Sequence, residues 1–203
     1  MNEQQLPYYT APAGLRDRVL SAVRRAPSRR AARWRPAVWM TGIAAGLVLM
    51  VSGAWLFGAQ RRAAESEMTA VLDGHLRSLA PGRLADVAST DQHTVKPWFA
   101  GKLDFSPPVV DAASEGFPLV GARVDVVDGR NVAALVYSRR SHVINVFVRP
   151  LGPREGASGR DEERRGYNVV SWAAAGMRFW AVSDLNVQEL TQLRDLLVAR
   201  IGG

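Results

Sequence analysis

The chain of 203 residues contains no cysteine. This absence excludes disulfides, a thiolate nucleophile, a cysteine-linked lipid anchor and any zinc site with cysteine ligands. Export to an oxidising compartment is permitted, but disulfides do not stabilise the chain there.

Several signatures of catalysis are missing as well. The sequence has no glycine-framed nucleophile elbow, no pair of histidines at metal-ligand spacing and no glycine-rich phosphate loop. Its densest polar group offers His93, Asp104 and Ser106 as a hydrolase triad, or Asp91 and His93 as two metal ligands. Neither set has the spacing or the number of groups that its chemistry needs. We therefore predict a protein that is not an enzyme and that uses no cofactor or metal.

Charge is missing from one long apolar run. Residues 37–59 contain no Asp, Glu, Lys or Arg, and Trp39 and Trp55 lie near the two ends. A helix of this length spans roughly 35 Å, and a bilayer core is ~30 Å thick. Indole rings favour the membrane interface. The run predicts a transmembrane helix, because buried helices of soluble domains rarely extend this far without a charge.

The arginines predict how that helix is oriented. Eight arginines precede residue 37, against Glu3 and Asp17, whereas the two arginines after the run are closely followed by Glu65 and Glu67. The arginine-rich flank stays in the cytoplasm, so the C-terminal part lies outside. A cleavable signal peptide is the alternative, but both the apolar run and its charged flank are too long for one.

The net charge of +7 comes largely from this N-terminal flank. Membrane topology and anionic lipid explain it without direct binding of nucleic acid. Residues 13–26 have apolar side chains at helical spacing with arginines on the remainder, which predicts a basic amphipathic helix. Such a helix lies on the inner leaflet or binds a cytoplasmic partner protein. Within the apolar run, Gly42 and Gly46 form a G-x-x-x-G match, which permits homodimerisation through the span.

The part after residue 60 has two kinds of pattern. Residues 61–80 carry an apolar stripe that predicts a helix, with His75 packed in the stripe, and residues 83–118 are irregular and rich in proline. β-branched runs then predict strands, with a hairpin at Asp128-Gly129 and a charged, flexible loop at 150–166. The five predicted strands occupy residues 119–127, 131–137, 142–148, 167–173 and 177–183.

A last helix is expected after Asn186, which forms a capping box with Glu189. Successive strands joined by short turns pair antiparallel. The predicted fold class is α+β: a single transmembrane helix followed by an antiparallel meander of about five strands with packed helices. The predicted domains are a short cytoplasmic segment (1–36), a transmembrane helix (37–59) and an outer α+β sensor domain (60–203).

The irregular segment also holds the predicted sensor loop. Its polar and aromatic side chains surround a proline and suit binding better than catalysis; they are His93, Lys96, Trp98, Lys102 and Asp104. An ordinary structured loop, in which Trp98, Phe99 and Phe105 attach the chain to the sheet, is the alternative.

The run Asp91-Gln-His-Thr-Val-Lys-Pro-Trp-Phe-Ala-Gly-Lys-Leu-Asp-Phe-Ser-Pro-Pro108 resembles the hallmark of bacterial membrane-bound anti-sigma factors, as do Gly116-Phe-Pro-Leu119 and Val132-Ala-Ala-Leu-Val-Tyr137. This resemblance implies a single-pass protein of the inner membrane with a periplasmic domain. It also implies an extracytoplasmic-function sigma factor as partner. The cytoplasmic surface for that partner would be one face of the first helix, with Leu15, Val19, Leu20 and Val23.

Members of that family commonly begin with a helical domain carrying a His-x-x-x-Cys-x-x-Cys zinc motif. The sequence lacks this motif, so zinc binding does not carry over. A membrane-anchored periplasmic adaptor or binding protein that does not bind a sigma factor is the competing expectation.

Overall fold

The computed structural model describes residues 12–25, 35–153, 155–156 and 159–202, and divides into two units, residues 1–57 and 58–203. In the first unit, α1 (Leu15–Arg25) is preceded by a turn in which the Pro12 carbonyl accepts from the Leu15 amide at 3.1 Å. The predicted amphipathic helix is therefore present. A second helix, α2 (Arg35–Ser78), begins in the first unit and ends in the second.

The predicted transmembrane helix falls within α2. Among the residues that the structure describes, no helix is long and apolar enough to cross a membrane. Residues 37–45 and 47 lie outside those whose side chains are described. A span at residues 37–59 therefore stays a prediction without support from the structure.

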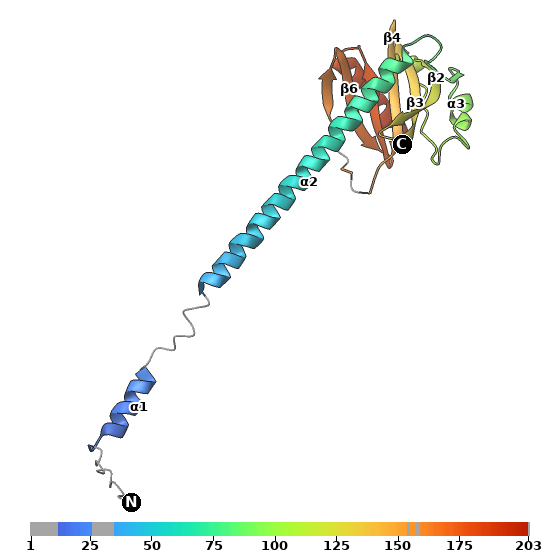
Figure 1. Ribbon diagram of the computed structural model, residues 1–203. Helices are drawn as coiled ribbons and strands as arrows, with labels where there is room; N and C mark the ends of the chain where they lie inside the picture. The colour runs from blue at the N-terminus through green and yellow to red at the C-terminus, as the bar shows by residue number, and fades with distance from the viewer. Residues whose placement is uncertain (1–11, 26–34, 154, 157–158, 203) are drawn as a thin grey trace, which may run out of the picture. The chain divides into compact units, whose positions relative to one another are not determined.

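The second unit is α+β and contains a seven-stranded antiparallel sheet in the order β1-β2-β3-β4-β7-β6-β5 (Figure 1). Five strands match the sequence prediction closely, and β1 and β5 add an edge on each side. The strands are β1 (Val87–Ala88), β2 (Leu119–Val127), β3 (Arg130–Arg139), β4 (His142–Pro150), β5 (Asp161–Arg164), β6 (Tyr167–Ala174) and β7 (Met177–Ser183).

Two-residue turns join the hairpins because their residues accept positive φ. Asp128 (φ 49°) and Gly129 (φ 73°) connect β2 to β3, confirming the predicted hairpin. Ala175 (φ 48°) and Gly176 (φ 74°) connect β6 to β7 in the same way. Positive φ at both central residues gives the twist that matches paired strands.

The predicted simple meander is wrong at one position. β4 pairs with β7, not with the next strand along the chain, and β5 lies at the far edge beyond β6. The prediction of a flexible loop at 150–166 is wrong for residues 161–164, which form β5. Charged side chains occupy this strand because an edge strand has one solvent-facing side, and charge there discourages further pairing.

The segment 83–118 also has more structure than predicted. It contains β1, the helix α3 (Gln92–Trp98) and a short 3-10 helix, η1 (Ala113–Glu115). The Asp91 carboxylate starts α3 by accepting from the His93 amide at 2.8 Å. Val95 and Phe99 are buried, so this segment is attached to the sheet through its apolar side chains.

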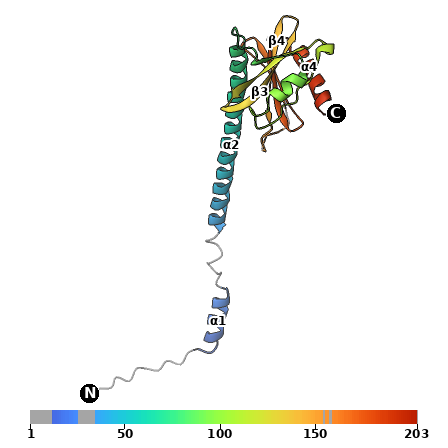
Figure 2. The same cartoon turned by 90° about the vertical axis from the view of Figure 1, so that its right-hand side faces the viewer.

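Helices cover both faces of the sheet (Figure 2). The C-terminal part of α2 packs on one face, where Val71 and Leu72 meet Phe147 and Trp180. The final helix α4 (Val187–Ile201) and the segment around α3 share the other face. α4 starts as predicted, with the Asn186 side chain accepting from the Glu189 amide at 2.9 Å.

Candidate functional site

The predicted sensor loop is not one loop, because His93, Lys96 and Trp98 lie on α3, and only Lys102 and Asp104 lie in the turn that follows it. Short local hydrogen bonds hold this turn. The Phe99 carbonyl accepts from the amides of Lys102 (3.0 Å) and Leu103 (3.2 Å), and Gly101 (φ 76°) provides the reversal between them. Phe99 itself is buried in the core. The buried Phe99 thus attaches the turn at residues 99–105 to the core. We call this turn the ridge.

Four of the five predicted loop residues are exposed, and one is half-buried. Lys102 and Asp104 are exposed on the ridge, and the Lys102 ammonium lies 4.7 Å from the centre of the half-buried Trp98 ring. Lys96 and His93 are exposed on α3. The alternative interpretation, in which Trp98, Phe99 and Phe105 attach this segment to the sheet, is therefore also correct. The polar residues lie around these aromatic side chains.

A groove of about 780 Å³ runs beside this ridge. Its lining comes from three separate parts of the chain: the ridge with Lys102 and Asp104, the start of β3, and the end of β4 with the residues after it. A second hollow of about 530 Å³ lies against the same ridge and is lined by Lys96. Lys102 and Asp104 therefore face one groove together, whereas His93 lines neither hollow.

Sequence reasoning missed the other walls of the groove. They are Arg130 and Asn131 at the start of β3 and Arg149, Pro150 and Leu151 at the end of β4. Two features of the sequence could have indicated these walls: Arg130 directly follows the Asp128-Gly129 turn, and Arg149 is a single arginine at the end of an apolar strand. Neither feature says which loop will lie opposite, because that depends on long-range packing.

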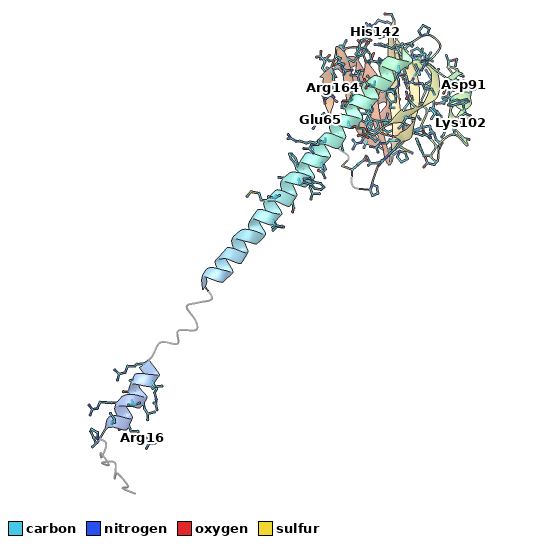
Figure 3. All side chains as sticks on the ribbon, in the orientation of Figure 1. Arg16, Glu65, Asp91, Lys102, His142 and Arg164 are labelled. Carbon is cyan, nitrogen blue, oxygen red and sulfur yellow. The ribbon has the colours of Figure 1, made fainter. Side chains whose placement is uncertain are left out.

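Two polar side chains in this part of the molecule, Asp91 and His142, make structural contacts. Asp91 caps α3 and also accepts from the Thr94 hydroxyl at 3.0 Å; these hydrogen bonds hold the pKa of its carboxyl below the usual range. His142 opens β4 and pairs with Asp184 at 2.9 Å. Figure 3 shows His142 well apart from Asp91 and Lys102. Within the described part of the chain, no group of three or more His, Asp or Glu is placed to hold a metal ion.

Arg149 connects the groove to α2. Its guanidinium bonds to the carboxylate of Glu67 on α2 and to that of Glu155 at 2.9 Å, and lies over the Trp180 ring at 5.1 Å. The Arg149 side chain is only 5% exposed. One buried cation thus touches the groove, the sheet and the helix.

A second polar group joins α2 to the centre of the sheet. Asn145 donates to His75 at 2.7 Å and to the Ser78 hydroxyl at 2.7 Å, and accepts from Arg123 at 2.9 Å. All four side chains are buried. Burial, followed by the nearby Arg123 charge, lowers the pKa of His75 to about 4. His75 therefore stays neutral at pH 7, and its prediction as a packed side chain is confirmed.

The backbone of α2 approaches the sheet closely at one glycine. A Cβ at Gly74 would lie 3.2 Å from the Phe147 ring, tighter than most real contacts. Further polar pairs extend along the helix: Ser66 with Asp128 (2.8 Å), Thr69 with Arg164 (2.8 Å) and Arg77 with Asp125 (3.3 Å). These contacts define one register of α2 on the sheet.

The predicted partner face of α1 is exposed. Leu15, Val19, Leu20 and Val23 are 44–67% exposed, as a helix face awaiting a partner or a lipid surface would be. For the predicted dimerisation motif, Gly46 has open space around it, and the surroundings of Gly42 lie outside the described residues. The structure tests neither prediction.

No protein-family model matches the sequence, and no curated protein matches it.

Proposed function

We propose that this chain is a single-pass regulator that restrains an extracytoplasmic-function sigma factor at the inner face of a bacterial membrane. Residues 60–203 would form a periplasmic sensor domain, and residues 37–59 the span. The proposal rests on the resemblance of residues 91–108 to membrane-bound anti-sigma factors and on the apolar run with its arginine-rich flank.

The observation that best supports a signalling role is the composition of α2. This one helix includes the apolar run and also the segment docked on the sheet by His75, Ser78 and Glu67. A change at the sheet would therefore act on the same helix that continues toward the cytoplasmic side. Buried polar contacts suit such a role, because they distinguish one docked register from others.

At the cytoplasmic side the proposed contact is α1. A sigma factor bound there cannot join RNA polymerase, which is restraint by sequestration. The apolar side chains Leu15, Val19, Leu20 and Val23 would fill a groove on the partner as an amphipathic helix does. The second candidate is an adaptor in which the same basic face lies on anionic lipid.

Co-purification tests the restraint. The tagged full chain is extracted from its native cells in detergent, and bound proteins are identified by mass spectrometry. We expect one sigma factor with the wild type and none with Leu15→Asp plus Val19→Asp. The control is Arg25→Asp, which changes the charge by the same amount on the opposite side of α1 and keeps the partner. A wild type that retains no sigma factor would leave the adaptor as the function.

A separate experiment tests the topology. Alkaline phosphatase, which is active only outside the cytoplasm, is fused after residue 203, and an active fusion is expected. An inactive fusion that is well expressed would show that the second unit is cytoplasmic.

A further inference from the structure

The groove beside the sensor ridge has an uneven charge. Its lining includes the cations Lys102, Arg130 and Arg149 and one carboxylate, Asp104. Arg149 is neutralised by Glu67 and Glu155. Lys102 and Arg130 make no ion pair with any residue that the structure describes, and both are exposed. An anionic group entering the groove would therefore meet two cations that are not already paired.

Apolar side chains complete the lining. Leu103 and Phe105 come from the ridge, and Leu151 with Pro150 and Pro153 from the segment after β4. The amide of Leu151 donates to the Gly176 carbonyl at 2.8 Å, and the Arg149 guanidinium donates to the Pro150 carbonyl at 2.9 Å. The wall opposite the ridge is thus held by both backbone and side chain. A ligand in the groove would therefore contact preformed apolar surface as well as charged side chains.

The groove is an open trough. Lys102, Asp104, Arg130, Asn131 and Pro150 on its walls are all exposed. Small molecules favour enclosed pockets that bury most of their surface. An extended peptide suits a trough, because it needs alternate side chains held on one side while the other side stays in solvent. The side-chain amide of Asn131 has no hydrogen-bond partner among the described residues and can pair with a peptide backbone.

We propose that this groove binds an extended acidic peptide segment, with its carboxylates at Lys102 and Arg130 and its apolar side chains against Leu103, Phe105 and Leu151. The inference deepens the proposed function and rests on it in one respect, that the outer domain senses a ligand. Arg149, at the floor of the groove, also holds Glu67 of α2. The bound segment therefore lies next to the contact that docks the helix.

A randomised dodecapeptide library displayed on phage tests the ligand class, with the full chain immobilised in detergent. The expected result is enrichment of Asp or Glu beside Leu, Ile or Phe. A synthetic copy of an enriched peptide should lose at least about tenfold in affinity for Lys102→Glu plus Arg130→Glu, since attraction becomes repulsion at two sites. The matched control, Arg83→Glu plus Arg194→Glu, changes equal charge outside the groove and should bind as the wild type does.

Three results would overturn the inference. They are selection without enrichment of acidic residues, equal affinity for the groove variant and the wild type, and an affinity that a free Leu-Glu dipeptide already matches. The last result would assign the groove to a small acid. Co-purification of the sigma factor is measured separately on the same chain, so failure of peptide binding and failure of the proposed restraint can be told apart.

Discussion

On the face of the sheet that α4 covers, the buried side chains are almost all apolar, whereas the face that α2 covers buries Arg123, Asn145 and Arg149 among its aromatic residues. On the α4 face, Trp172 and Phe179 stack at 5.0 Å, and the Tyr137 hydroxyl donates to the Val110 carbonyl at 2.8 Å. Apolar packing is tolerant of small shifts, but a buried hydrogen bond is not. The α4 face thus provides stability, and the α2 face determines how one helix docks.

Removing an aromatic ring from the α4 face should have the largest effect. Phe179→Ala leaves a cavity beside Trp172 and should lower the free energy of unfolding by about 3–5 kcal/mol. Chemical denaturation of the solubilised full chain, followed by near-UV circular dichroism, measures this. A loss below about 1 kcal/mol would show that the α4 face does not carry the stability assigned to it.

Acidification should weaken the α2 face selectively. His75 has a pKa of about 4 in the folded protein and 6.5 as its ordinary value. The unfolded chain therefore binds more protons between pH 6.5 and pH 4, and stability falls as pH falls through this window. The full shift corresponds to about 3 kcal/mol.

The control for this pH dependence is His75→Gln. Carboxylates titrate in both proteins, so the difference between their stability–pH curves isolates the histidine. Denaturation at several pH values between 7 and 4 gives both curves. Parallel curves would mean that the pKa of His75 in the folded protein equals that of an exposed histidine.

Loss of the ion pair between α2 and the groove floor should have a smaller effect. Glu67→Gln removes one of two carboxylates around Arg149, which keeps Glu155, and should cost about 1–2 kcal/mol. Hydrogen exchange should rise at residues 60–78 more than at β6 and β7. A uniform rise over the whole unit would contradict a docking role that is specific to α2.

The exposed pair on the same helix should matter least. Arg77 bonds to Asp125 at 3.3 Å, but its side chain is 54% exposed. Arg77→Gln should change the free energy of unfolding by no more than about 0.5 kcal/mol, because solvent screens such pairs. A larger change in a denaturation experiment would mean that Arg77 belongs to the buried network around Arg123.

The site could be predicted only in part from the sequence. Lys102 and Asp104 were identified as a polar loop near aromatic anchors, and the structure brings both to one groove. His93 was grouped with them by proximity in sequence, but it lies on α3 and lines neither hollow. Arg130 and Arg149 could not be predicted as part of the site, because β3 and β4 approach the loop through contacts between residues that are far apart in the sequence.

Features that depend on residues close together in the chain could be predicted. Runs of β-branched side chains located β2 and β3, the Asp128-Gly129 pair predicted the first hairpin, and Asn186 predicted the start of α4. The physical reason is that strand alternation, positive φ and helix capping act over a few residues. Long-range packing sets the pairing of β4 with β7, the edge position of β5 and the burial of Asn145 against His75. Each of these features depends on which apolar surfaces, far apart in the sequence, are buried against one another. No local sequence pattern encodes that choice.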